Sequence, residues 1–459
     1  MAKQKSHTNK NLSFEDFKKE VLQDYELANL SRQLSILGRK EVLTGKAKFG
    51  IFGDGKEIPQ IAMAKFFKNG DWRSGYYRDQ TFMLATATFT AEEFFAQLYG
   101  DTEIEKNPSN GGRSFNNHFG TRLLHENGSW KDLMKQKNSS ADISPTSGQM
   151  PRLLGLAYAS KLYRRNKNLH SLTRFSDKGN EVAFGTIGDA STSEGHFFET
   201  MNAAGVLQVP MAMSVWDDGY GISVPIEHQT TKKSISELLK GFEKNASEKG
   251  FYIFKEKAWN YPGLVKMYQE GIAKCRKEHV PVLFHVTEVT QPLGHSTSGS
   301  HERYKSKERL DWEKEYDCIR KMGEWMISKK IATKEELSDI EDKARTKALE
   351  AKKSAWKSFT APIKKERDAL VQIIENKTCV CKREKYDKTS AIANELKRIL
   401  NPIRKDNFSA AKKLLRHVCM DCSIREELQA NISAWLQKIM KKILSVITTN
   451  CIANAKNQL

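Results

Sequence analysis

The sequence predicts an α/β fold: a three-layer parallel sheet covered by helices, followed by an α-helical C-terminal extension. Three apolar, strand-like runs lie in its middle part, at residues 182–187, 210–215 and 280–286. Stretches of helical pattern, 194–207 and 264–276, lie between them. Strand–helix–strand alternation is typical of a parallel sheet with helices on both faces. No glycine follows Gly323, and Lys, Glu, Ala and Leu dominate from there on, which predicts helices without strands.

These changes in composition divide the chain into three predicted regions. Residues 1–44 form an N-terminal leader and helix, residues 45–310 form the α/β domain, and residues 311–459 form a basic helical extension or linker. Within the last region we expect helices, joined by a connector at 379–389, over 334–373, 390–400, 409–418 and 423–447.

Length and composition exclude a disordered chain but leave several classes of function open. The chain has 459 residues, 39% of them hydrophobic, which is enough to bury a sizeable core. Its net charge is +19, and most of the excess lies in the C-terminal third. A basic nucleic-acid-binding protein is one interpretation. A solvated, lysine-rich helical surface is the preferred one, because neither zinc-finger spacing nor an RNA-reading motif occurs.

Cysteine usage and the lack of apolar runs predict a cytoplasmic protein without a membrane segment. The chain has seven cysteines and no apolar run of the ~20 residues that a membrane span needs. The first ten residues are basic but have neither an apolar core nor an Arg-rich amphipathic pattern, so we interpret them as a frayed leader. Cys379, Cys381, Cys419 and Cys422 could form a four-thiolate metal site, although their spacing is a weak signal.

The chemically informative segments follow the first two predicted strands. The first strand ends in Gly188-Asp189-Ala190-Ser191, and the second ends in an acidic, Gly-rich turn at 217–221. In a parallel sheet both turns lie at the carboxyl edge, where ligands bind. Small residues there let backbone amides approach a phosphate, and the helix N-terminus that follows favours its negative charge.

The same turns predict a magnesium site. Asp189 and Asp218 each offer a carboxylate oxygen, and the backbone near Tyr220 offers a carbonyl. With two diphosphate oxygens and one water, these groups would complete the octahedral oxygen shell that Mg²⁺ prefers. The spacing from Asp189 to Asp218 fits one helix, one strand and their turns, so we expect the two carboxylates at neighbouring strand ends.

These motifs resemble the signature of thiamine-diphosphate enzymes, Gly-Asp-Gly followed about thirty residues later by Asn. More narrowly, they resemble the alpha subunits of the decarboxylating component of pyruvate and branched-chain 2-oxo acid dehydrogenases. Those subunits carry a Ser-Glu-Gly, as at 193–195 here, and an Asn-Gly-Tyr-x-Ile-Ser, similar to 218–223. The resemblance covers roughly residues 45–310 and implies a sheet of the thiamine-diphosphate-binding type.

Further segments match in the same order and imply roles for more residues. Tyr77 and Arg78 resemble the pair that contacts the cofactor diphosphate, and Ser144 and Thr146 lie in a loop resembling the one that holds its aminopyrimidine end. The resemblance also implies that the following residues bind the cofactor: Gly188, Asp189, Ala190, Ser191, Asp218, Tyr220 and Ile222.

Two histidines are candidate catalytic residues. His295 lies in Gly294-His295-Ser296, resembling a Gly-His-Ser loop that acts on the substrate or in acyl transfer. His118 lies in a segment resembling the family's Gly-Arg…His-Tyr-Gly. For Glu194, at the start of a helix, we expect a capping role, and in the heteromeric family a beta subunit supplies the activating Glu.

The resemblance implies a complete enzyme as well as a site. The chain would use thiamine diphosphate and Mg²⁺ for the oxidative decarboxylation of a 2-oxo acid, either a branched-chain acid such as 3-methyl-2-oxobutanoate or pyruvate. The acyl group would pass to lipoamide on a lipoyl acyltransferase core. A beta subunit would complete the site in an alpha2-beta2 heterotetramer.

The chain departs from the family pattern at several positions. Asp218 stands for the metal-site Asn, Trp216 for a common Arg, Ala190 for the second Gly of the signature, and Gln291 or Pro292 for an Arg before the loop histidine. A catalytically inactive homologue that acts as a scaffold therefore remains an alternative. Residues 53–55 also spell Gly-Asp-Gly, but no buried strand precedes them, and we interpret them as a loop at a subunit contact.

Overall fold

Six parallel strands form the centre of the structure, a computed structural model that describes residues 13–376, 388–418, 420 and 423–451. The strands are, in their order across the sheet, β2 (Asn138–Ser139), β1 (Trp72–Ser74), β3 (Ala183–Gly188), β4 (Met211–Trp216), β8 (Val282–Thr287) and β7 (Tyr252–Lys257). All neighbouring pairs are parallel. The predicted α/β fold and the three predicted strands are confirmed.

Alternation along the strands sends side chains to two different cores. In β4, Met211, Met213 and Val215 pack into one core, while Ala212 and Trp216 pack into the other. This alternation follows from the two-residue period of a strand. Both faces are apolar, which explains why the strands are continuous hydrophobic runs in the sequence.

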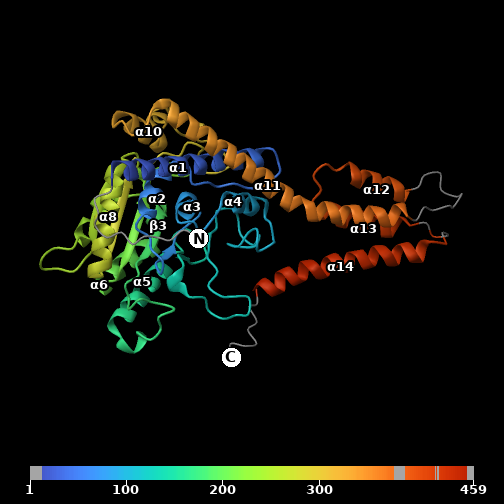
Figure 1. The fold of residues 1–459 in the computed structure, drawn as a ribbon, viewed down its shortest axis with the longest axis horizontal. Coiled ribbons are helices and arrows are strands. Elements are labelled where there is room, and N and C mark those ends of the chain that lie inside the picture. Colours follow the sequence, from blue (N-terminus) through green and yellow to red (C-terminus); the bar gives the residue numbers. More distant parts are fainter. Residues whose placement is uncertain (1–12, 377–387, 419, 421–422, 452–459) are drawn as a thin grey trace.

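Helices cover each face of the sheet. α5 (Met150–Arg165) and α6 (Gly195–Leu207) pack on one face, and α2 (Glu57–Ala64) and α8 (Tyr261–Glu278) pack on the other. The latter core extends to α1 (Phe14–Leu43), which lies along the first half of α11 (Lys334–Glu375) (Figure 1). The remaining α-helices of this body are α3 (Gln80–Ala85), α4 (Ala91–Tyr99), α7 (Ile235–Leu238), α9 (Lys307–Glu315) and α10 (Cys318–Ser328).

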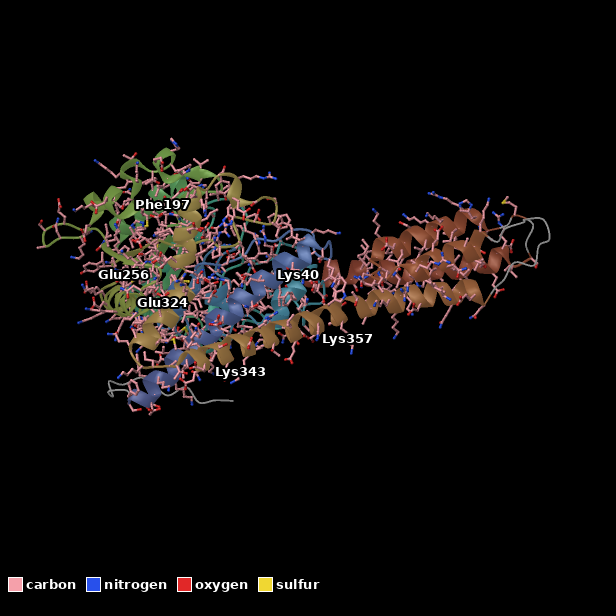
Figure 2. All side chains as sticks on the ribbon, turned by 90° about the horizontal axis from the view of Figure 1, so that it is seen from above. Lys40, Phe197, Glu256, Glu324, Lys343 and Lys357 are labelled. Atoms are coloured by element: carbon pink, nitrogen blue, oxygen red, sulfur yellow. The ribbon has the colours of Figure 1, made fainter. Side chains whose placement is uncertain are left out.

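A helical arm extends from this body. α11 passes Lys343 and Lys357 and continues into the arm (Figure 2). There its last turns share a separate core with α12 (Lys388–Arg398), α13 (Arg404–His417) and α14 (Arg425–Cys451). That core begins at Leu370, whereas Ala344, Ala348 and Ala351 of α11 still belong to the core of the body.

The helices predicted after residue 334 are present, within a few residues of their expected bounds. The connector predicted at 379–389 lies mostly outside the described residues, as do Cys379, Cys381, Cys419 and Cys422 of the possible thiolate site. Within the described ranges, no group of three or more metal-ligating side chains occurs, and no helix is long and apolar enough to cross a membrane.

Three strands of the sheet were not predicted, because none of them is apolar along its whole length. β1 is Trp-Arg-Ser, and its Arg73 and Ser74 are buried through polar contacts rather than apolar ones. β2 has only two residues, and β7 is an edge strand whose side chains are half-buried or exposed. The antiparallel pair β5 (Tyr220–Gly221) and β6 (Val224–Pro225) is likewise too short to show a pattern.

His279 predicts acid sensitivity of the fold. It ends α8, where its Nε2 lies 2.8 Å from the carbonyl oxygen of Gly179, and burial together with Arg164 lowers its pKa from 6.5 to about 4. The unfolded chain therefore binds one more proton than the folded chain between these values, so this residue makes the free energy of unfolding fall as pH drops from 6.5 to 4.

We expect His279→Asn to make this decline shallower. Asn tolerates the left-handed backbone at this position (φ +55°) but does not titrate. Chemical denaturation at a series of pH values measures the slope. An unchanged slope in the variant would show that His279 is not the titrating group.

Candidate active site

Two acidic turns meet at the carboxyl edge of the sheet. β3 and β4 are parallel neighbours in register, with Gly188 opposite Trp216. Asp189, the residue directly after β3, donates its backbone N–H to the carbonyl of Trp216 at 3.1 Å. Asp189 and Asp218 therefore follow adjacent strand ends, as the spacing between them predicted.

The Asp189 side chain is buried and incompletely bonded. It is 2% exposed, and its Oδ2 has no hydrogen-bond partner in the described structure. Burial, followed by the charges of Asp218 and Asp217, raises its pKa well above the usual range. A buried carboxylate oxygen without a partner is costly, and a bound cation would relieve that cost.

Asp218 lies beside a lysine rather than alone. Its Oδ1 accepts the backbone N–H of Tyr220 at 3.1 Å, and its Oδ2 lies 3.6 Å from Nζ of Lys56. Its backbone carbonyl accepts a hydrogen bond from Arg309 at 2.7 Å, which anchors the turn. Oδ2 of Asp217 instead lies 2.8 Å from Nε2 of His285, a contact that fixes the turn to strand β8.

The residues after β3 leave room for a phosphate. A side chain added at Gly188 would meet only the Tyr76 hydroxyl, at 3.5 Å. Ala190 and Ser191 lie in a single 3₁₀ turn, and the Ser191 carbonyl accepts a hydrogen bond from Ser147 at 2.5 Å. Glu194 occupies the N-cap position of α6, as expected, but its side chain makes no capping hydrogen bond.

Arg78 and His295 contact each other and lie close enough to Asp218 for its charge to act on the histidine. The Arg78 guanidinium is 4% exposed and donates to two backbone carbonyls, those of Phe52 at 2.7 Å and His295 at 3.0 Å. Among the described residues, no carboxylate oxygen lies within 4.0 Å of the Arg78 guanidinium nitrogens. Burial, then Arg78, lowers the pKa of His295 to about 4, against an opposing effect of Asp218. His295 is therefore neutral at pH 7.

The second predicted histidine belongs to a neighbouring group. His118 Nε2 lies 2.9 Å from the Ser144 hydroxyl, and its ring centre is 6.3 Å from that of Tyr77. The loop that carries Ser144 also carries Thr146, which is exposed. Ile222 is 59% exposed and has a φ of +57°, which is strained for a β-branched residue and is typical of functional sites.

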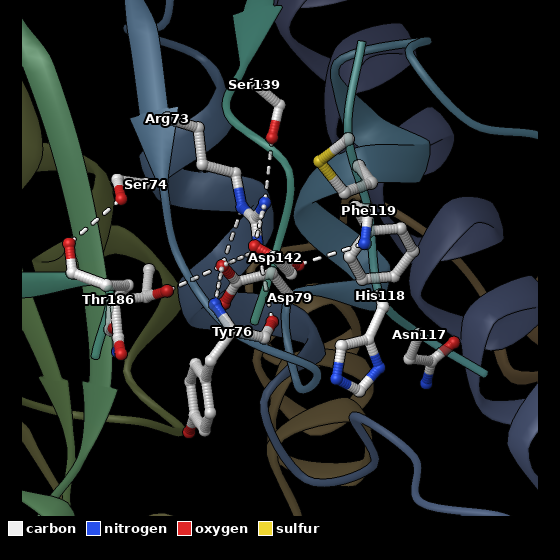
Figure 3. A network of polar contacts seen from close by, with 12 residues as sticks. Arg73, Ser74, Tyr76, Asp79, Asn117, His118, Phe119, Ser139, Asp142 and Thr186 are labelled. Carbon is white, nitrogen blue, oxygen red and sulfur yellow. Dashed lines mark hydrogen bonds and ion pairs between the residues drawn. The ribbon is translucent and has the colours of Figure 1, made fainter. Parts of the chain in front are cut away.

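A buried ion network holds these loops in place. The Arg73 guanidinium binds Asp79 and Asp142 (Figure 3). All three residues are buried, and none is more than 8% exposed. Asp79 also accepts the Thr186 hydroxyl and the backbone N–H of Tyr76, and Asp142 accepts that of Phe119. One arginine thus joins β1, β3 and the segments that carry Tyr77, Arg78 and His118.

Comparison with known families gives this geometry a context. The model of the Dehydrogenase E1 component family matches residues 25–246 and 264–364, which together are most of the chain. The chain belongs to this family. Members of the Dehydrogenase E1 component family depend on thiamine diphosphate.

Several alpha subunits are similar to this member of the family. The chain is 24% identical to "2-oxoisovalerate dehydrogenase subunit alpha 1, mitochondrial" of Arabidopsis thaliana over 70% of its own length and 59% of that protein. It is 24% identical to the alpha subunit named for the same enzyme in Homo sapiens, over 73% of this chain and 66% of that protein. It is 27% identical to the alpha subunit of Bacillus subtilis, over 43% of this chain and 51% of that protein. The matches thus span about half to two thirds of these relatives.

The Gly-Asp-Gly at 53–55 packs against other loops of the same chain, and its interpretation as a subunit-contact loop stays a prediction. Asp54 is 1% exposed and accepts the backbone N–H of Leu293 at 2.8 Å. Gly55 has a φ of +83°, and a side chain there would lie 1.8 Å from the Thr290 carbonyl oxygen. The loop packs against the segment before His295 and directs Lys56 toward Asp218.

Sequence reasoning missed Lys56 and the Arg73 network. Lys56 lies in a polar loop that no strand precedes, so nothing in the local pattern indicates burial. Arg73 and Asp142 are 69 residues apart and carry no motif. The one available signal was the position of Arg73 a few residues before Tyr77-Arg78-Asp79.

The buried network should dominate the stability of the site. Replacing Arg73 by Met leaves the carboxylates of Asp79 and Asp142 buried without their cation, and breaking a buried pair costs about 3–5 kcal/mol. We expect a loss of this order in the free energy of unfolding measured by urea denaturation.

The matched control is Arg320→Met. Arg320 pairs with Glu324 on the surface, at 56% and 46% side-chain exposure, and surface pairs contribute at most about 1 kcal/mol. Equal losses in the two variants would contradict the importance of the network.

Proposed function

We propose that this chain is the alpha subunit of a thiamine-diphosphate-dependent 2-oxo acid dehydrogenase, which carries out oxidative decarboxylation with acyl transfer to lipoamide. The observation that carries the proposal is the meeting of Asp189 and Asp218 at adjacent strand ends, next to a buried Arg78 that has no carboxylate partner recorded in the described structure. Acidic oxygens for a divalent cation and a buried cation for an anion are the two halves of a metal–diphosphate site.

The residues present fit this cofactor. Asp189, with its free Oδ2, and Asp218 would hold Mg²⁺ together with the carbonyl of Tyr220. The open backbone at Gly188, Ala190 and Ser191 would bind the diphosphate together with Arg78 and Tyr77. Ser144, Thr146 and Ile222 would contact the organic part, where Ile222 and Thr146 are exposed and available to be covered.

When bound, thiamine diphosphate supplies an acceptor for the electron pair that is released as carbon dioxide leaves. The chain supplies binding, orientation and a neutral histidine. Because the pKa of His295 is about 4, its ring can accept a proton or a hydrogen bond at neutral pH without first losing one. His118, bonded to Ser144, is the second candidate catalytic residue.

The substrate and partners follow from the relatives' names as proposals. All three relatives are named as alpha subunits of 2-oxoisovalerate dehydrogenase, which favours a branched-chain 2-oxo acid such as 3-methyl-2-oxobutanoate over pyruvate. We propose a beta subunit that completes an alpha2-beta2 heterotetramer, and a lipoyl acyltransferase core that receives the acyl group. Two of the relatives' names include the word mitochondrial and the bacterial one does not, so a cytoplasmic location stays a prediction.

One set of observations favours a second candidate, an inactive homologue that acts as a scaffold. Trp216 is fully buried in the core of the sheet, where relatives commonly have a charged Arg, and Asp218 already faces a lysine. Decarboxylation of a 2-oxo acid by the chain mixed with its beta partner would exclude this candidate. The basic arm leaves nucleic-acid binding as a third prediction, which a lack of salt-sensitive affinity for DNA and RNA would contradict.

The metal site gives the main test. We expect Asp189→Ala, in a complex with a beta chain, to abolish magnesium-dependent binding of thiamine diphosphate and to reduce decarboxylation at least 100-fold. The reason is the loss of a hard oxygen ligand with no nearby substitute. Calorimetry measures the binding, and release of carbon dioxide from 3-methyl-2-oxobutanoate measures the activity.

Glu194→Gln is the control for that test, because Glu194 is exposed, makes no capping bond and lies only five residues away. It should retain both affinity and activity. A wild-type complex that binds no cofactor at saturating Mg²⁺ would disprove the proposed function.

His295 gives a test of catalysis separate from binding. We expect His295→Asn to lower the turnover of the complex by about 10²–10⁴-fold, the usual contribution of a positioned acid or base, with little change in cofactor affinity. His125→Asn, at an exposed histidine, serves as the control. Normal turnover in the His295 variant would remove this residue from the reaction.

A further inference from the structure

Lys56 is a buried cation without an adequate partner. Its side chain is 1% exposed, yet its nearest recorded contacts are long: 3.6 Å to Oδ2 of Asp218 and 3.4 Å to the amide oxygen of Gln291. An ammonium has three donors and normally forms contacts of about 2.7–2.9 Å with carboxylates. Lys305, the comparable buried lysine of this body, lies 2.7 Å from Glu313.

The position of Lys56 in the structure disfavours the charged form of its side chain. It is the N-cap residue of α2, at the positive end of the helix dipole, where a cation is unfavourable. Burial lowers its pKa most, and Arg78 lowers it further against the effect of Asp218, so the two cations lie close enough to repel each other. The other acids near Lys56 are engaged elsewhere: Glu57 pairs with Arg32 at 2.7 Å, and Asp54 accepts the Leu293 N–H.

The fold nevertheless holds Lys56 in this place. The left-handed backbone of Gly55 packs against the Thr290 carbonyl and leads directly into Lys56, the N-cap residue of α2, whose Nζ lies 3.6 Å from Oδ2 of Asp218. Arg78 approaches the same place and has only the carbonyls of Phe52 and His295 as recorded partners. Two converging buried cations, beside an unpartnered Asp189 oxygen, are the arrangement expected when an anion and a divalent cation both bind there.

We propose that Lys56 is a cofactor-binding residue of this site, whose ammonium contacts the diphosphate of thiamine diphosphate and offsets the negative charge of Asp218. This inference rests on the proposed function and extends it, because it assigns a further diphosphate ligand to the loop at 53–56. Lys56 and Arg78 then flank the diphosphate, and Asp189 and Asp218 face the magnesium ion.

The test compares affinities for thiamine diphosphate with Mg²⁺, measured by calorimetry on the complex of the full chain with its beta partner. We expect Lys56→Gln and the apolar isostere Lys56→Met each to raise the Kd at least tenfold. Lys65→Gln is the matched control, since Lys65 caps the opposite end of α2 and pairs with Glu20 and Asp24. It should leave the Kd within threefold of the wild type. Thermal melting without cofactor verifies that each variant is folded. If Lys56→Gln does not fold, the Kd of Lys56→Met alone decides the test.

The double variant Lys56→Gln/Asp218→Asn separates two roles. If Lys56 contacts the diphosphate, the double variant still binds thiamine diphosphate weakly, because the ammonium that contacts the diphosphate is missing. If Lys56 only neutralises Asp218, removing both charges restores wild-type affinity, and the inference is overturned.

An unchanged Kd in Lys56→Gln also overturns it, and the proposed function then stands. A wild-type complex that fails to bind thiamine diphosphate at all overturns the proposed function itself, which distinguishes the two failures.

Discussion

The parallel pairing of β3 with β4 is the constraint on which the candidate site depends. With Gly188 opposite Trp216, the two strands end together, and the residues that follow them must share one edge of the sheet. Asp189 and Asp218 are brought together by this register rather than by a direct contact. A shift by one residue would also exchange the two cores, because Met213 and Val215 would leave the α5–α6 face. Core packing therefore fixes the geometry of the site.

Two groups of buried charged residues lie near this edge, and they differ in how closely each charge is paired with an opposite charge. Beneath the site, Arg73 is fully paired with Asp79 and Asp142, and these groups also bind backbone N–H groups of the surrounding loops. In the site itself, Lys56, Arg78 and Asp189 are buried with long, neutral or missing partners. The paired network stabilises the loops, although Oδ1 of Asp79 has no hydrogen-bond partner in the described structure. The groups above it that lack a close charged partner are those available to a ligand.

The arm has a different physical basis. α11 belongs to the body through small alanines that allow α1 to approach closely, and then to the arm through Leu370 and Ile374. Glu366 marks the transition: it pairs with Arg404 at 3.1 Å, and its carbonyl accepts the Trp435 indole N–H. The family match ends at residue 364, close to this point, so most of the arm lies outside the matched part of the chain.

The sequence alone determined the fold class, the central strands, the helical nature of the C-terminal third and the pair Asp189–Asp218. These features depend on short-range patterns: apolar runs, helical periodicity, and turns that follow strands directly. The polar strand β1, the half-exposed edge strand β7 and the network of Arg73 were decided by tertiary structure. Their burial depends on partners far away in the sequence, such as Thr186, which lies 107 residues after Asp79. The same holds for Lys56, which follows a Gly-Asp-Gly that looks like a surface turn. Only packing against Thr290 and Leu293 places that loop inside the chain and its lysine beside Asp218.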